Sequence, residues 1–197
     1  LKMFFDENSI LYYSPNDINT DQNFINIAKS KAMGFGFGET WTFTKQTVDL
    51  FKGCLLDIMR IPLPHYRGGA HYTWQILRNN KLGACHLQII NEDMVQGVFD
   101  SGDLVKSSEY FFSTNARIPK DYFDEAEAHE LKFLKEFISD VESESEFDLT
   151  PVPEKFSLYF PRLHTKSQAF INWSWTIEDI ESFICAFDDP YPGASTF

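Results

Sequence analysis

The segment at residues 61–77 combines side chains that could bind a ligand; it reads IPLPHYRGGAHYTWQIL. Its two prolines fix an extended loop, and its arginine offers a planar set of hydrogen-bond donors. Two adjacent glycines let the chain turn directly into a helix, whose N-terminus favours anions or the polar atoms of a partner. We therefore expect a ligand-binding loop. Its candidate residues are His65, Tyr66, Arg67, Gly68 and His71.

Three glycines alternate with aromatic residues in GFGFGETW, at residues 34–41. The alternation invites comparison with the turn that binds a dinucleotide. That turn requires a third small residue at position 39, where this chain has Glu39, and a carboxylate there would repel a pyrophosphate. We expect a tight bend at the end of a strand, on an edge that faces a ligand.

The five histidines and three cysteines show no spacing typical of a metal site or a nucleophilic triad. His65 and His71 flank the YRGG turn but share no helix or strand face, so we expect no metal ion. Cys54, Cys85 and Cys185 lie in separate apolar runs. An odd number of cysteines without a CxxC motif fits a reduced, cytoplasmic protein.

The length of 197 residues suits one substantial core with a small appendage. The 17 basic and 29 acidic residues give a net charge of -12, which disfavours a surface devoted to nucleic acid or to an anionic membrane. Residues 121–148 hold 11 acidic and 2 basic residues, so the rest of the chain carries only -3. The start LKMFFDENS does not resemble a signal peptide, and no run of 18 apolar residues indicates a membrane span.

Strands and helices alternate along the predicted chain. Apolar runs predict strands, which we place at 10–14, 54–59, 84–91, 104–112 and 156–163. Amphipathic patterns with capping residues predict helices, which we start near Thr20 or Asp21, at Thr44, at Ala70, at Pro119 and at Thr176. This alternation predicts an α/β fold whose sheet is at least partly parallel.

A long amphipathic helix is predicted from Pro119 to about Val141, with its acidic residues on a solvated face. The apolar residues available for its buried face are Phe123, Ala126, Leu131, Leu134, Phe137 and Ile138. The acidic, proline-containing stretch ESESEFDLTPVPEK follows and predicts a linker. We expect an α/β domain at 1–148 and a linker with a C-terminal segment at 149–197.

Three segments resemble the folate-dependent formyltransferases, a family that includes methionyl-tRNA and amino-sugar N-formyltransferases. The first is PLPHYRGGAHYTWQIL, which is similar to the family's Leu-Pro and Tyr-Arg-Gly loop and its apolar helix with tryptophan. The second is FDSGDLV, similar to the Asp-Thr-Gly segment, and the third is FINWSWTIEDIESFICAFDDPYPGAST. The matches occur in family order and cover about residues 34–197, so the chain resembles a divergent member.

The resemblance implies a Rossmann-like sheet, here lacking or shortened in its opening strands, followed by the start of a small C-terminal region. It also implies a one-carbon transferase that moves a formyl group from 10-formyltetrahydrofolate to an amine. In the family, Asn and His side chains stabilise the oxyanion that forms when the amine attacks, and an Asp orients the His. Such preorganised donors contribute on the order of several kcal/mol.

Two of the three family catalytic residues are substituted in this chain. The Asn position falls on Asp57 and the His position on Met59, whereas the Asp position falls on Asp100. A carboxylate at 57 would repel an oxyanion, and a thioether at 59 has no proton to give. Because the loop at 91–100 is longer than the family's, the segment 95–97 is a competing alignment for the Asp.

The family's folate site implies co-substrate contacts on two loops of this chain. These candidate residues are Gly38, Glu39, Trp41 and Asn91.

Two functions follow from these readings. The first is an N-formyltransferase that acts on a small-molecule amine. We favour an amino sugar nucleotide over tRNA as its substrate, because the chain is acidic and lacks a basic cluster. In that case His65 or His71 could reach the vacated site. The second is a catalytically degraded protein, a pseudoenzyme that keeps the fold as a binding or scaffold module.

Overall fold

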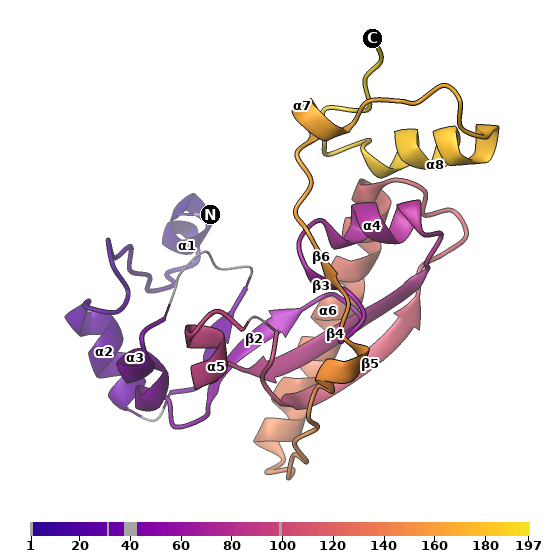
Figure 1. Cartoon of the computed structure of the whole chain (residues 1–197). Helices are drawn as coiled ribbons and strands as arrows, with labels where there is room; N and C mark the ends of the chain where they lie inside the picture. The colour runs from indigo at the N-terminus through magenta and orange to yellow at the C-terminus, as the bar shows by residue number, and fades with distance from the viewer. Residues whose placement is uncertain (1, 31, 38–42, 99) are drawn as a thin grey trace.

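The computed structural model describes residues 2–30, 32–37, 43–98 and 100–197 (Figure 1). Helices and strands alternate over most of the chain. In chain order the elements are α1 (Lys2–Glu7), α2 (Gln22–Lys29), β1 (Gly34–Gly36), α3 (Lys45–Leu50), β2 (Leu55–Met59), β3 (Arg67–Gly68), α4 (His71–Leu77), β4 (Leu82–Ile89), α5 (Glu92–Val95), β5 (Leu104–Phe111), α6 (Pro119–Glu142), a 3-10 turn (Glu154–Phe156), β6 (Tyr159–Phe160), α7 (Thr165–Gln168) and α8 (Ile177–Ala186).

A four-stranded sheet in the order β1-β2-β4-β5 forms the centre of the fold. β1 runs parallel to β2, whereas β2 with β4 and β4 with β5 are antiparallel. A separate parallel pair joins β3 to β6. The predicted α/β class with a partly parallel sheet is therefore confirmed.

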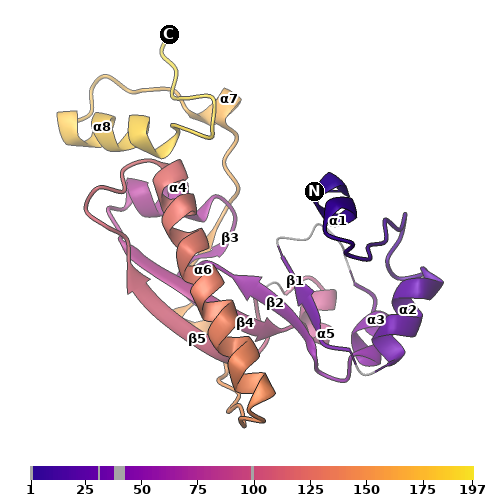
Figure 2. The ribbon, with the colours of Figure 1, turned by 180° about the vertical axis from the view of Figure 1, so that it is seen from behind.

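Helix α6 lies across one face of the sheet (Figure 2). Alternate residues of β2 and β4 face it and form a common core, because successive side chains of a strand point to opposite faces. The buried residues of this core are Leu56, Ile58, Cys85, Leu87, Phe133 and Phe137. Removal of this apolar surface from water holds the helix on the sheet.

Several predicted elements and caps are confirmed. The side chain of Asp21 caps α2 and that of Thr44 caps α3, and Thr176 caps α8, each by accepting a backbone N–H. The expected strands at 54–59, 84–91 and 104–112 correspond to β2, β4 and β5.

Four expectations differ from the structure. Residues 10–14 form no strand, the expected strand at 156–163 shortens to β6, and the loop after β4 contains the short helix α5. On α6 the buried stripe runs through Tyr122, Ala126 and Phe133, whereas Leu131 and Ile138 are exposed. The stripe follows the three- and four-residue spacing of the helix, and these two residues lie one position beyond it.

The C-terminal segment returns to the α/β body after α6. Leu104 and Thr150 form a bridge, β6 pairs with β3, and α8 packs on α4 at one end of the sheet (Figure 1). The two regions share one core, which includes Tyr72, Ile76, Phe112, Tyr122, Ala169, Phe183 and Phe187.

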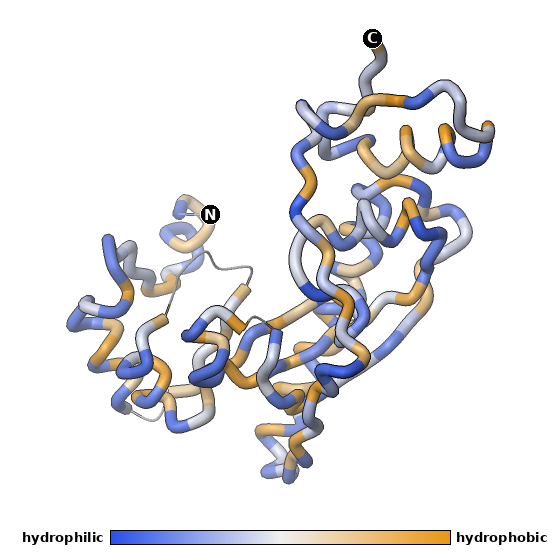
Figure 3. The backbone as a smooth tube through the Cα atoms, in the orientation of Figure 1, coloured by the Kyte–Doolittle hydropathy of each residue, from blue (hydrophilic) through white to orange (hydrophobic). Residues whose placement is uncertain are grey.

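Polar and apolar residues alternate at short intervals along the chain (Figure 3). Among the described residues no helix has the length and apolar character needed to cross a membrane.

Gly102 allows the loop before β5 to lie against the end of β4. A Cβ atom at this position would overlap the backbone carbonyl oxygen of Ile89 and approach the side chain of Gln88. The Gln88 amide also donates to the Gly102 carbonyl over 2.7 Å. Close packing therefore explains the glycine of the DSGD segment.

We predict that Gly102→Ala lowers the free energy of unfolding by about 3 kcal/mol, because a backbone oxygen cannot move aside as a side chain can. Ser101→Ala, the control in the same loop, removes a single exposed hydrogen bond and should cost about 0.5 kcal/mol. Urea unfolding of both variants measures the difference. Equal stability of the two variants would contradict the packing argument.

Candidate functional site

A cavity of about 240 Å³ opens where β2 ends, and we call it the β2 cavity. Strand ends, the loop after β2, α4 and α6 all contribute to its walls. The described lining residues are Phe37, Asp57, Ile58, Met59, Arg60, Ile61, Gly68, His71, Tyr72, Phe123 and Glu130. The carboxyl ends of strands β1 and β2 meet here, which is where ligands bind in open α/β sheets.

The two residues predicted to stand at substituted family positions both line this cavity. Asp57 and Met59 are half-buried on β2 and line it together. They point away from the face that packs on α6, because Leu56 and Ile58 take that face. The alignment therefore places the carboxylate and the thioether at one strand end.

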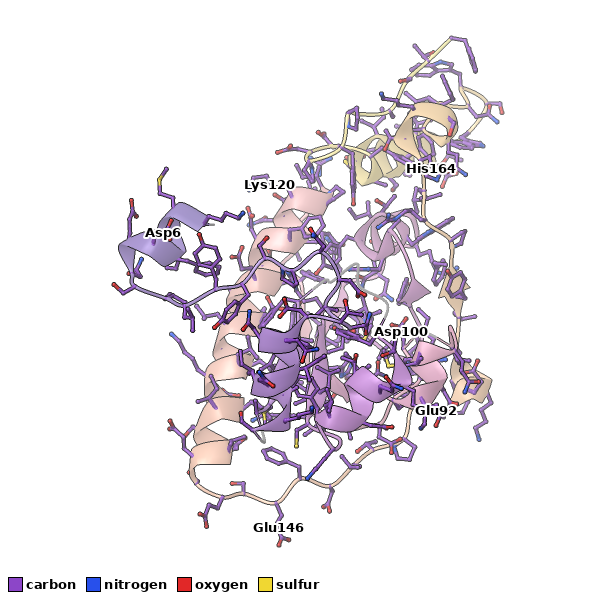
Figure 4. The ribbon with its side chains drawn as sticks, turned by 90° about the vertical axis from the view of Figure 1, so that its left-hand side faces the viewer. Asp6, Glu92, Asp100, Lys120, Glu146 and His164 are labelled. Atoms are coloured by element: carbon purple, nitrogen blue, oxygen red, sulfur yellow. The ribbon has the colours of Figure 1, made fainter. Side chains whose placement is uncertain are left out.

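Asp100 lies behind the β2 cavity and approaches it through Gly68. Its side chain is 9% exposed, and its Oδ2 accepts a hydrogen bond from the Gly68 N–H over 3.4 Å. Burial raises the pKa of Asp100, although that hydrogen bond and the charge of Arg67 act in the opposite direction. Figure 4 shows Asp100 among the side chains at the centre of the molecule.

The competing segment 95–97 lies elsewhere. Val95 is half-buried at the end of α5 and packs against the cluster that contains Phe51 and Ile90, while Gln96 is exposed. Of the two alignments, the one that uses Asp100 therefore places a carboxylate beside the ligand loop.

His71 and Tyr72 open helix α4 and line the same cavity. Burial and the nearby charge of Arg60 lower the pKa of His71 to about 4, so its imidazole is neutral at pH 7. The Tyr72 side chain is 2% exposed, and its hydroxyl has no hydrogen-bond partner among the described residues. Burial raises the pKa of this hydroxyl, so it keeps its proton. A buried hydroxyl without a partner is suited to a polar ligand atom.

Arg60 and Glu130 form an ion pair at the wall of the β2 cavity, with 3.3 Å between Nε and Oε1. Glu130 belongs to α6, whose acidic residues were expected on a solvated face, yet it is 9% exposed. Burial raises the pKa of its carboxyl. The missed signal is its spacing, since Glu130 follows Ala126 by four residues and precedes Phe133 by three.

The predicted ligand loop divides between two roles. Gly68 and His71 line the cavity, whereas His65 is exposed and is not among the described lining residues. Tyr66 is buried, stacks on Phe160 with ring centres 5.0 Å apart, and its hydroxyl accepts from the Asn80 amide over 2.9 Å. It therefore holds the loop in place.

Arg67 also has a holding role. Its guanidinium is buried, and Nη1 donates to the carboxylate of Glu154 in the returning linker. Nε and Nη2 have no hydrogen-bond partner among the described residues. The arginine thus joins the ligand loop to the linker.

The expected folate contacts are placed only in part. Gly38, Glu39 and Trp41 lie outside the described residues. Asn91 caps α5, since its Oδ1 accepts from the Met94 N–H over 3.0 Å. Within the described part of the chain no three His, Cys, Asp or Glu side chains are grouped to hold a metal ion.

Comparisons with known proteins agree with the predicted resemblance. A family model described as the C-terminal domain of formyl transferases matches residues 164–197. Methionyl-tRNA formyltransferases of Clostridium beijerinckii and Clostridium botulinum are 23% and 24% identical, over 96% and 93% of this chain. The chain spans 59% and 57% of the length of these two relatives.

Solved structures of formyltransferases share the fold. An N-formyltransferase from Helicobacter canadensis, in complex with folinic acid and dTDP-3-aminofucose, superposes with a TM-score of 0.70 at 18% identity, over 95% of this chain and 63% of that one. Methionyl-tRNA formyltransferase from Clostridium thermocellum gives 0.68 at 16% identity, over 100% and 81%. The comparisons confirm the resemblance to the formyltransferase family and the formyltransferase α/β fold.

We predict that Asp100→Asn raises the free energy of unfolding at pH 7. Burial favours the protonated carboxyl, so the folded protein binds more protons than the unfolded chain above the ordinary pKa of 3.8. The contribution of the Asp100 carboxyl to the free energy of unfolding is therefore fully present at low pH, and it is lost as the pH rises through the raised pKa. Asparagine can still accept from the Gly68 N–H without a charge.

Urea unfolding between pH 3 and pH 8 measures the effect. The gain of Asp100→Asn over the parent should vanish below pH 3.8, and the control Asp103→Asn in the same loop should give no comparable gain. A loss of stability at pH 7 would show that the Asp100 carboxylate is held by a favourable charge instead.

Proposed function

We propose that the β2 cavity is a formyltransferase site that moves a formyl group from 10-formyltetrahydrofolate to the amine of an amino sugar nucleotide or a similar small molecule. One observation carries the proposal: Asp57 and Met59, at two family positions, line one cavity with His71. The retained Asp100 reaches the same loop through Gly68. In this proposal His71 of α4 takes the place of the histidine that the family carries at the position of Met59 on β2.

The choice of substrates is supported by the relatives and by charge. The Helicobacter canadensis structure is a complex with a folate and an amino sugar nucleotide, whereas the relatives similar in sequence are methionyl-tRNA formyltransferases. The net charge of -12 favours a small amine over a polyanionic RNA. Three free cysteines support a reducing, cytoplasmic setting.

The cavity fits the reacting end of the substrates. Its volume of about 240 Å³ is below the roughly 300–1,000 Å³ of sites that enclose a drug-sized ligand. It would therefore hold the formyl group and the amine, with the rest of both molecules outside it. Phe37 and Phe123 supply apolar walls, and Tyr72 supplies a hydroxyl that no described residue engages in a hydrogen bond.

Formyl transfer joins the amine nitrogen to the formyl carbon and breaks the bond from that carbon to the folate nitrogen. One proton leaves the amine and one is taken up by the departing nitrogen, so the reaction balances. His71 is placed to accept the first proton. A base with a pKa near 4 is weak toward a free ammonium group, but the attacking nitrogen becomes far more acidic as its new bond forms.

Charge on the formyl oxygen requires a donor, and Tyr72 can provide one. Its hydroxyl stays protonated in the buried site and has no competing partner among the described residues. Asp57 would repel an oxyanion but would attract a substrate ammonium group, so we assign it to binding the amine. That ammonium group releases one proton to water before the neutral amine attacks. Asp100 acts as a positioning residue through the Gly68 backbone.

We predict that His71→Asn slows formyl transfer at least about a hundredfold, because a positioned acid or base typically contributes 10²–10⁴ in rate. Release of formate from 10-formyltetrahydrofolate gives a readout that does not depend on the acceptor. His65→Asn, an exposed histidine of the same loop, is the control and should leave the rate unchanged.

Thermal unfolding and folate titration show whether each variant still folds and binds. Unchanged turnover in His71→Asn would remove His71 from the reaction. Folate binding without turnover in the parent would instead favour a binding or scaffold protein.

We also predict that Asp57→Asn combined with Met59→His raises formyl transfer at least tenfold. The pair restores the family's donors at a strand end that already lines the cavity, and one such donor contributes about 10²–10³ in rate. Either single change should do little, because the groups act as a unit. A double variant that binds folate but releases formate no faster than the parent would contradict the alignment.

A further inference from the structure

Arg60 follows the last residue of β2 and is the one cation at pH 7 among the described residues that line the β2 cavity, since His71 is neutral. Its side chain is 35% exposed, and its Nε lies 3.3 Å from Oε1 of Glu130. Glu130 belongs to α6, which crosses one face of the sheet (Figure 2). Arg60 therefore turns toward the α6 side of the cavity, opposite the side of Asp57 and Met59.

Most hydrogen-bond donors of Arg60 have no acceptor among the described residues. The ion pair with Glu130 involves Nε, and neither Nη1 nor Nη2 forms a hydrogen bond or an ion pair with any residue in the described ranges. A guanidinium carries its donors in one rigid plane, so the contact at Nε also restricts the direction of the others. Arg60 thus supplies the cavity with oriented donors that this part of the chain leaves unused.

Tyr72 lines the same cavity and adds a second unused donor. Its side chain is buried, and its hydroxyl has no hydrogen-bond partner in the described part of the chain. Burial raises the pKa of Tyr72, and the charge of Arg60 opposes that rise. Burial lowers the pKa of His71, and the charge of Arg60 lowers it further. The guanidinium is therefore within electrostatic reach of both side chains, and this donor set favours an oxygen atom of a ligand.

The two sides of the β2 cavity differ in charge. On the side of Asp57, a carboxylate favours a positive group such as the substrate ammonium. On the α6 side, Arg60 compensates the charge of Glu130, and its remaining donors favour negative charge. Attack of a neutral amine on a formyl carbon separates charge in the same sense, with positive charge on the nitrogen and negative charge on the oxygen.

We infer that Arg60 is a catalytic residue that stabilises the negative charge on the formyl oxygen, and that Glu130 is a positioning residue that fixes its guanidinium. The assignment rests on the proposed formyl transfer. When the amine nitrogen bonds to the formyl carbon, an electron pair of the carbonyl group moves to the oxygen, and Arg60 and Tyr72 donate hydrogen bonds to it. When the bond to the folate nitrogen breaks, that pair re-forms the carbonyl group, and both donors keep their protons.

Arg60→Gln should slow the release of formate from 10-formyltetrahydrofolate about a hundred- to a thousandfold, as the loss of one such donor does. Charge on the oxygen develops only in the transition state, so the loss should fall on kcat and leave KM nearly unchanged. Arg117→Gln is the matched control and should leave the rate unchanged. Arg117 also pairs with a glutamate, Glu181, but it does not line the cavity.

A second variant separates the chemistry from the fold. Arg60→Gln leaves the buried Glu130 carboxylate without its partner, which is destabilising by itself. The double variant Arg60→Gln with Glu130→Gln removes both charges and keeps two amides that can bond to each other. We expect it to regain the thermal stability of the parent and to remain as slow as Arg60→Gln. Recovery of both stability and turnover would show that the pair is only structural and would overturn the inference.

Titration of the full 197-residue chain with isotope-labelled formate, followed by NMR, tests the donors without a reaction. We expect formate to bind to the parent, roughly tenfold or more weakly to Arg60→Gln, and unchanged to Arg117→Gln. No binding to the parent at high millimolar concentration, or equal weakening in both variants, would overturn the inference. Formate release that Arg60→Gln leaves unchanged would refute the role of Arg60 alone. Formate binding that depends on Arg60, in a parent that releases no formate, would refute formyl transfer and leave Arg60 as an anion-binding residue.

Discussion

Three segments that are distant in the sequence meet at the backbone of Gly68. Its N–H faces the Asp100 carboxylate, and its Cα lies so close to the Phe160 carbonyl oxygen of β6 that a Cβ would overlap that atom. The backbone also has a φ of +99°, a conformation that side chains rarely allow. Only a glycine meets all three demands at once. The ligand loop, the Asp100 loop and the returning linker therefore hold their relative positions through one residue.

Buried and half-buried arginines lie around this contact, although the chain as a whole carries a net charge of -12. Arg67 is buried next to Gly68 and carries the positive charge between Asp100 and Glu154. On the cavity side, Arg60 pairs with Glu130. A charge withdrawn from water persists only where a partner compensates the loss, and for Arg67 and Arg60 that partner is a glutamate of the protein itself.

In the proposed site, residues of α4 compensate for the substitutions predicted at Asp57 and Met59. In the predicted alignment, Asp57 and Met59 of β2 stand where the family has Asn and His, and a carboxylate and a thioether alone cannot stabilise an oxyanion. The first turn of α4 brings a neutral imidazole and a protonated hydroxyl to the same cavity. A site of this kind would keep the reaction of the family with donors from another element. Such an exchange needs both elements at one place, and β2 ends and α4 begins at the same cavity.

Local patterns in the sequence determined much of the fold. Apolar runs predicted β2, β4 and β5, capping side chains placed the starts of α2, α3 and α8, and the order of motifs indicated the formyltransferase fold. The family resemblance also predicted that Asp57 and Met59 occupy substituted catalytic positions, and this alignment stays a prediction. Tertiary structure decided that His71 lines the β2 cavity while His65 is exposed, and that Glu130 leaves the solvated face. Periodicity in the sequence describes one helix or strand at a time. These outcomes depend on which elements touch one another, and contacts between segments that are distant in the sequence determine this.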